Sequence, residues 1–123
     1  MKVAIQQSPW SRVDLFEAAG FDVVEAPIST EDEFIDLLRD VDGATIGTKP
    51  LTNRRVLEAC PNLKVVSRMG VGVDSIDLAA AAELGILACN VPGVNTAEVA
   101  DHAMAMLLAL TRRLPDSIRT TRE

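Results

Sequence analysis

Two glycines separated by one residue lie in the segment Met69 to Ser75, directly after a short run rich in valine. Glycine permits positive φ angles, so the consecutive backbone N–H groups at 70 to 72 could turn inward and form a small nest for an anion. A carboxylate would suit such a nest. A tight turn from a strand into a helix would also use glycines here, and the residue types leave both interpretations open.

The same glycine pair does not complete a dinucleotide-binding fingerprint. That fingerprint needs a third glycine three residues after the second, and position 75 is Ser. It also needs a strand with an acidic end about 20 residues later, whereas that interval reads as a helix over 78–84 and a strand over 86–90. We therefore do not expect this loop to hold the phosphates of a dinucleotide.

Few other residues have the types and spacing of a chemical site. Cys60 and Cys89 form no close pair, and the single histidine, His102, gives no zinc-like cluster with them. We expect no metal site and two reduced, mostly buried thiols. The 18 acidic residues outnumber the 12 basic ones and give a formal charge of -6, which argues against nucleic acid or an anionic membrane surface as a partner.

Short apolar runs alternate with helix-like segments over the first 90 or so residues. The runs are rich in Val and Ile without polar alternation, as expected where helices cover both faces of a parallel sheet. The pattern predicts an α/β fold with a flavodoxin-like, doubly wound parallel five-stranded sheet, whose ligands lie at the carboxyl ends of the strands. The expected strands are Val3–Gln6, Asp22–Ala26, Ala44–Gly47, Val65–Arg68 and Ile86–Asn90. The expected helices are Arg12–Ala19, Glu31–Val41, Arg54–Ala59 and Leu78–Leu84.

Side chains that accept hydrogen bonds from free backbone N–H groups stand where three of these helices should begin. The candidate caps are Ser29 or Thr30, Thr52 or Asn53, and Asp77. Gly20 and Gly85 fall where two helices should end in a left-handed residue before the next strand.

A different kind of helix is expected from Asn95 to about Arg113. Apolar residues occupy nearly every direction around it, which is typical of a helix that is buried on all sides. Such a helix needs more surrounding protein than a five-stranded unit obviously supplies. The polar segment Leu114–Glu123 is expected to be a connection, because Pro115 would stop or kink the helix.

We expect no targeting signal in the first residues. The apolar-rich run near Met1 soon reaches Ser8 and Pro9, which makes it much too short for the core of a signal peptide. No stretch reaches the roughly 18 apolar residues that cross a bilayer. We expect a cytoplasmic protein with no membrane partner.

Three motifs occur in one order: Val65-Val66-Ser67-Arg68-Met69-Gly70-Val71-Gly72-Val73-Asp74-Ser75-Ile76-Asp77-Leu78, then Asn90-Val91-Pro92 after Gly85-Ile86, then Asn95-Thr96-Ala97-Glu98-Val99-Ala100-Asp101-His102. Together they resemble the D-isomer-specific 2-hydroxyacid dehydrogenase family, close to its phosphoglycerate dehydrogenase members. The earlier Gly47-Thr48-Lys49-Pro50-Leu51-Thr52 resembles the loop after the third strand in the same proteins.

Members of that family combine a substrate domain with an NAD-binding domain. The resemblance implies that residues 1–94 form the flavodoxin-like substrate-binding domain. It implies that residues 95–123 form a hinge helix leading to an NAD-binding domain that is absent from this chain. In the full-length protein, a hydride would pass between NAD(H) and a small 2-hydroxy or 2-oxo acid.

The resemblance also implies roles for particular residues. Gly70, Val71 and Gly72 would contact the substrate carboxylate through backbone N–H groups. Asn95 would lie beside substrate and nicotinamide. Val71 would also lie near the nicotinamide, and Val99 would pack on the cofactor.

No catalytic residue is implied within this chain, because the catalytic groups of the family come after the hinge helix. His102 lies on that helix, so it is expected to be a packed or capping residue and not the proton donor. Asp101 stands where the family more often has Glu, which is a conservative difference. We expect the 123-residue chain alone to be inactive, because hydride transfer needs cofactor, acid and substrate held together.

The alternative is a stand-alone flavodoxin-like module that binds a ligand or partner without catalysis. A signalling receiver is excluded, since it needs carboxylates after the first and third strands, where Gln6-Gln7-Ser8 and Gly47-Thr48-Lys49 stand. A flavin role lacks the Ser/Thr-rich phosphate loop after the first strand. Without a covering domain, the apolar helix predicts a homo-oligomer that associates through residues 95–113.

Overall fold

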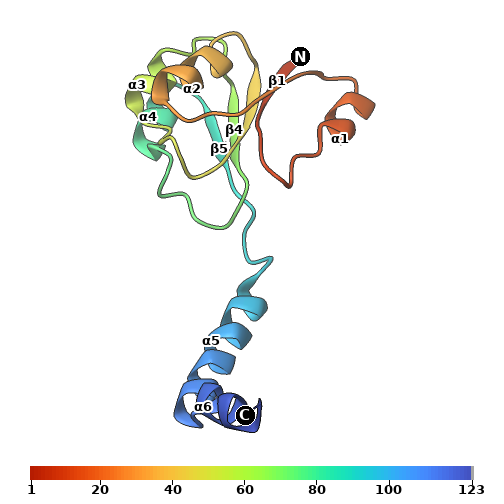
Figure 1. The fold of residues 1–123 in the computed structure, drawn as a ribbon. Helices are drawn as coiled ribbons and strands as arrows, with labels where there is room; N and C mark the ends of the chain where they lie inside the picture. The colour runs from red at the N-terminus through yellow and green to blue at the C-terminus, as the bar shows by residue number, and fades with distance from the viewer. Residues whose placement is uncertain (123) are drawn as a thin grey trace. The chain divides into compact units, whose positions relative to one another are not determined.

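The computed structural model describes residues 1–122 and divides into two compact units. The first unit is Met1–Pro92 and contains the whole sheet; the second begins at Gly93 and is helical (Figure 1).

Five short strands form one sheet in the order β2-β1-β3-β4-β5, and every neighbouring pair is parallel. This is the flavodoxin-like order, so the expected fold class is confirmed. Because all the strands run the same way, their carboxyl ends lie at one edge of the sheet. The strands are β1 (Lys2–Gln6), β2 (Asp22–Ala26), β3 (Gly43–Ile46), β4 (Val65–Arg68) and β5 (Leu87–Cys89).

Helices cover the two faces of the sheet unequally. They are α1 (Val13–Ala18), α2 (Glu31–Leu38), α3 (Arg54–Glu58) and α4 (Leu78–Glu83). Figure 1 shows α2, α3 and α4 together on one side of the sheet and α1 on the other. The main core lies under the group of three, where Phe34, Leu38 and Val56 are fully buried against Val66 of β4. Helix α1 contributes no buried residue.

Helix α2 begins with a complete capping box. The Thr30 hydroxyl accepts a hydrogen bond from the Glu33 N–H at 3.3 Å, and the Glu33 carboxylate accepts one from the Thr30 N–H at 3.0 Å. Of the two expected candidates, Thr30 and not Ser29 is therefore the cap. The reciprocal pair satisfies two backbone donors that the helix itself cannot satisfy.

Helices α3 and α4 begin at polar caps as well. Asn53, and not Thr52, caps α3 by accepting from the Val56 N–H at 3.1 Å. The Asp77 carboxylate caps α4, as expected. Thr52 is instead fully buried, and it forms an isolated parallel bridge with Ile76.

The second unit contains α5 (Thr96–Thr111) and α6 (Leu114–Arg122). The long apolar helix does stop before Pro115, since α5 ends at Thr111, but the segment expected only as a connection forms a helix of its own, α6; Glu123 lies outside the described residues. Pro115 is the second residue of α6. A proline is tolerated in the first turn because the N–H groups there have no helical partner to lose.

The apolar side chains of α5 are exposed around the helix. None of its residues is buried, and Val99 and Leu110 keep 61 % and 72 % of their surface accessible. Among the described residues, no helix combines the length and the apolar character needed to span a bilayer.

Candidate ligand site at the glycine loop

The glycine loop, residues 69–75, leaves β4 at the edge of the sheet where the strands end. Its first residue continues the sheet pattern, because the Met69 N–H donates to the Ile46 carbonyl at the end of β3 over 2.9 Å. The loop therefore begins at the edge where ligands of open α/β sheets bind.

Two contacts from the segment after β5 fix the orientation of the next peptide groups. The Val91 N–H donates to the Gly70 carbonyl at 3.0 Å, and the Asn90 side-chain amide donates to the Val71 carbonyl at 2.6 Å. In a trans peptide, a carbonyl and the following N–H point in opposite directions. The N–H groups of Val71 and Gly72 consequently point away from residues 90 and 91, and neither donates to an acceptor within residues 1–122.

Gly70 contributes differently from its two neighbours. Its N–H donates to the Arg68 carbonyl at 2.8 Å, so it is not available to a ligand, although 70 to 72 were all expected as donors. Its φ of +152° is one that side chains rarely adopt, and a Cβ added here would meet the Arg68 guanidinium. Gly70 therefore makes the turn, and Val71 and Gly72 supply the free amides.

The loop does not deliver a ligand to the start of α4. Five residues, 73–77, separate Gly72 from that helix, and the Asp77 carboxylate already accepts the Ala80 N–H there at 2.9 Å. A dinucleotide fingerprint instead runs directly into a helix whose free N–H groups receive the pyrophosphate. The loop geometry suits a small anion better than a dinucleotide.

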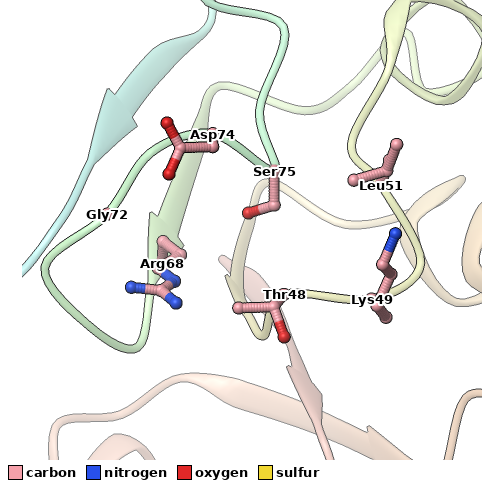
Figure 2. A pocket seen from close by; sticks show the side chains of 7 residues that line it. All are labelled: Thr48, Lys49, Leu51, Arg68, Gly72, Asp74 and Ser75. Carbon is pink, nitrogen blue, oxygen red and sulfur yellow. The ribbon is translucent and has the colours of Figure 1, made fainter.

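A cavity of about 250 Å³ borders Gly72 (Figure 2). At ~30 Å³ per molecule it has room for about eight waters, which is enough for the carbon chain of a small acid. Figure 2 shows the Arg68 guanidinium and the Lys49 side chain on opposite sides, with Ser75 and Thr48 between them. The lining residues are Thr48, Lys49, Leu51, Arg68, Gly72, Asp74 and Ser75.

Two polar atoms of this lining have no protein partner among the described residues. The Ser75 hydroxyl is buried, in a residue only 8 % exposed, and makes no hydrogen bond. The Arg68 Nε is buried and unpaired as well. Buried polar groups are almost always hydrogen-bonded, so these two atoms indicate that water or a ligand completes the site.

Hydrogen bonds fix the positions of the two loops that line the cavity, the loop after β3 and the glycine loop. The Thr52 N–H donates to the Ser75 carbonyl at 2.7 Å, and the Asp77 N–H donates to the Thr52 carbonyl at 2.9 Å. On the other side, the Gln6 side chain at the end of β1 accepts from the Gly47 N–H at 2.8 Å and donates to the Lys49 carbonyl at 2.6 Å. Lys49 and Ser75 thus project from backbone that is tied at several points.

Sequence reasoning did not identify the polar residues of the cavity. Arg68, Lys49 and Ser75 all lie within the resembling motifs, but none was expected to line a ligand site. The available signal was positional, since Arg68 ends an expected strand and Lys49 and Ser75 follow expected strands at the ligand-binding edge.

The remaining expected site residues lie in the second unit. Asn95 precedes α5, and its side chain caps no helix N–H, so the amide is not used within the helix start. Val99 lies one turn later. Both line a shallow hollow of about 350 Å³ on α5, together with Glu98, His102, Ala103 and Met106. Over residues 1–122, no group of three or more His, Cys, Asp or Glu side chains could hold a metal ion.

Comparison with known proteins gives one consistent family. The family profile described as D-isomer specific 2-hydroxyacid dehydrogenase, catalytic domain, matches residues 3–121. D-3-phosphoglycerate dehydrogenase from Archaeoglobus fulgidus is 33% identical over 111 residues, which are 90% of this chain and 21% of that protein.

Solved structures agree with the sequence relatives. The NAD-dependent formate dehydrogenase from Staphylococcus aureus, in complex with NAD, matches with a TM-score of 0.78 and 28% identity, over 100% of this chain and 42% of that one. The NAD⁺-bound 3-phosphoglycerate dehydrogenase from Entamoeba histolytica gives a TM-score of 0.76 and 25% identity, over 89% of this chain and 38% of that one. The chain spans about a fifth of the length of the curated relatives it matches.

Proposed function

The chain belongs to the D-isomer specific 2-hydroxyacid dehydrogenase family, and on this premise we propose that it binds the carboxylate of a 2-hydroxy or 2-oxo acid within an NAD-dependent oxidoreductase. The observation that carries the proposal is the pair of free amides at Val71 and Gly72. Their carbonyl neighbours are held by residues 90 and 91, so both N–H groups are preset for an acceptor. Because these N–H groups already have a fixed orientation, binding an anion requires little free energy to order them.

NAD would supply the hydride chemistry at the carbon that bears the hydroxyl group. This chain's own residues fit only the margin of such a cofactor. Val71, 41 % exposed beside the free amides, offers apolar surface that suits the face of a nicotinamide ring. Val99, exposed on α5 in the second unit, is proposed separately to pack on the cofactor. The described residues provide no loop for its phosphates, so those would be held by a further domain.

The other expected roles complete the same proposal. Asn95 would contribute its uncapped side-chain amide to the substrate. Residues 1–94 would act as the substrate domain and 95–123 as the hinge to the cofactor domain. No residue of this chain would donate the proton, and His102, which lines the hollow on α5, would keep a structural role. The comparisons lend no support to the alternative of a stand-alone module without catalysis.

Backbone NMR of the ¹⁵N-labelled chain tests the proposed carboxylate site directly. D-lactate should shift the amide signals of Val71 and Gly72, whereas D-lactamide, which has the same shape without the charge, should not. Equal effects of the two compounds, or none at these amides, would contradict the site.

The chain by itself should not turn over substrate. Purified residues 1–123 with NAD and D-lactate or D-3-phosphoglycerate should produce no NADH above the blank, because cofactor and acid–base groups are missing. The product of the complete gene is the positive control. Turnover by the isolated chain would place catalytic groups within residues 1–123 and overturn this part of the proposal.

A further inference from the structure

The connector, residues 90–95, leads from the end of β5 to the start of α5. Its first two residues are bonded to the glycine loop: the Asn90 amide donates to the Val71 carbonyl at 2.6 Å, and the Val91 N–H donates to the Gly70 carbonyl at 3.0 Å. The next four residues, 92–95, are exposed, and none of them donates a hydrogen bond to another described residue. Among the described residues, the hydrogen bonds from the connector to the rest of the first unit therefore go to the glycine loop alone.

Each of these contacts holds one end of a peptide group whose other end is free for a ligand. The Val71 carbonyl and the Gly72 N–H belong to one peptide group, and the Gly70 carbonyl and the Val71 N–H belong to the peptide group before it. A hydrogen bond to a carbonyl polarises the peptide, so the N–H at its other end becomes a stronger donor. The connector and a bound carboxylate would consequently act on the same two peptide groups from opposite ends.

The peptide between Val71 and Gly72 depends most on its contact with the connector. A peptide can flip when the residue after it accepts either sign of φ, which glycine does readily. The peptide between Gly70 and Val71 is followed by valine, whose branched side chain disfavours such a flip. Without Asn90, the Gly72 N–H would therefore be the first of the two amides to lose its orientation.

We propose that Asn90 and Val91 couple the carboxylate site to the segment that leads into α5. By holding two carbonyls they orient the amides for a carboxylate, and a bound carboxylate in turn strengthens their hold on the start of the connector. Because coupling free energies are reciprocal, whatever fixes the connector also raises the affinity for the acid. The proposal rests on the proposed function, since it assumes a carboxylate on the amides of Val71 and Gly72. Asn90 is then a positioning residue that acts through the Gly72 amide.

Titration of D-lactate into the ¹⁵N-labelled Asn90→Ala chain tests the positioning role. Asn90 is half-buried, and water can replace its amide at the exposed Val71 carbonyl, so the fold should persist. We expect the affinity for D-lactate to fall about threefold to tenfold, and the shift at Gly72 to be reduced more than the shift at Val71. Asn62→Ala is the matched control, because Asn62 is an exposed asparagine in the turn before β4 and should change neither shift.

Hydrogen exchange at the Val91 N–H tests the coupling in the other direction. This N–H donates to the Gly70 carbonyl, so its exchange reports whether the start of the connector is held. Saturating D-lactate should slow the exchange about threefold or more, whereas D-lactamide should not. In Asn90→Ala the slowing by D-lactate should be smaller. A merely structural asparagine would instead change the exchange rate by the same factor with and without the acid.

The parent chain separates this inference from the proposed function. If D-lactate shifts Val71 and Gly72, the carboxylate site exists. The coupling is then overturned if Val91 exchanges equally fast with and without the acid, or if Asn90→Ala binds D-lactate as tightly as the parent chain does. If D-lactate shifts neither amide, the proposed function itself fails, and the coupling fails with it.

Discussion

Peptide orientation at two residues decides what the glycine loop can bind. Glycine spacing left an anion nest and a tight turn both open, and the family resemblance implied donors at 70 to 72. The sequence could not predict that Gly70 would turn its N–H to the Arg68 carbonyl, or that Asn90 and Val91 would hold the carbonyls of the two following peptides. The contacts from Asn90 and Val91 come from a segment about 20 residues away, so no local pattern contains them.

Gly72→Val should weaken binding of 2-hydroxy acids at this loop. An added Cβ would lie 3.2 Å from the Asp74 carboxylate and 3.7 Å from the Arg68 guanidinium, and the rest of the side chain would crowd the amide that an acid must approach. The expected loss in D-lactate affinity is about tenfold or more, since one preset ionic hydrogen bond is lost. Val71→Ala keeps its amide and is the control. Unchanged affinity in Gly72→Val would place the anion site elsewhere.

The two cysteines should react very differently with a thiol reagent. Burial raises the pKa of the Cys60 thiol to about 11, whereas Cys89 is only half-buried. Because the thiolate is the reactive form, Cys60 should react roughly 300-fold more slowly at neutral pH than a thiol with the ordinary pKa of ~8.5. Mass spectrometry after brief labelling at neutral pH should find modification at Cys89 first. Rapid labelling of Cys60 in the folded chain would contradict its burial.

Helix starts were the part of the fold most accurately predicted, because a cap is a local feature. Asp77 was named outright, and Thr30 and Asn53 were each one of two candidates. Two helix ends were predicted as well, since Gly20 and Gly85 have the expected left-handed conformation, with φ of 83° and 71°. Other ends were predicted less accurately. The strand expected over Ile86–Asn90 is shorter, Leu87–Cys89, and α6 was missed because Pro115 was taken as a stop although it falls in a first turn.

Thr30→Ala should lower the free energy of unfolding by about 1 kcal/mol, the usual effect of losing an N-cap. The Thr30 hydroxyl is the acceptor for the Glu33 N–H, and alanine leaves that donor without a protein partner. Urea unfolding followed by circular dichroism measures the change. Ser29→Ala is the matched control, because Ser29 uses only its backbone N–H toward Glu33. Equal stability of Thr30→Ala and the parent chain would exclude a stabilising capping box.

The same box should give α2 a dependence on pH. Backbone hydrogen bonds from Ser29 and Thr30 hold the pKa of Glu33 below its ordinary value. A carboxylate with a lowered folded-state pKa stabilises the fold above its unfolded pKa, ~4.3 for Glu, and that contribution is lost as pH falls through the folded value. The stability difference between the parent chain and Glu33→Gln should therefore disappear on acidification. A difference that persists in acid would point to a cause other than ionisation.

At the scale of the whole molecule, the sequence predicted the flavodoxin-like sheet, and it predicted an apolar helix that the five-stranded unit does not cover. It expected burial around α5, and the described residues do not supply it. No residue of α5 is buried in this chain, which spans about a fifth of its curated relatives' length. Composition could therefore indicate that a partner surface exists without indicating which one.

We expect the isolated chain to associate through α5. Covering 400 Å² of apolar surface, a typical patch size for an interaction site, contributes on the order of 10 kcal/mol at ~25 cal/mol per Å² before the costs of association. Light scattering should find a dimer or higher oligomer. Met106→Asp or Leu110→Asp should change that distribution, whereas Leu15→Asp, at an exposed leucine of α1, should not. A monomer at all concentrations would refute association.

The strand order also bears on how the chain folds during its synthesis. Parallel neighbours cannot form a hairpin, so each strand must wait for a whole strand–helix unit before its partner is available. Here the sheet can grow in the order of translation: β1 pairs with β2, then accepts β3 on its other side, and β4 and β5 follow outward. Residues 90 and 91, which orient the amides of Val71 and Gly72, leave the ribosome only after all five strands. The nascent sheet can therefore be assembled before its candidate ligand site acquires its final geometry.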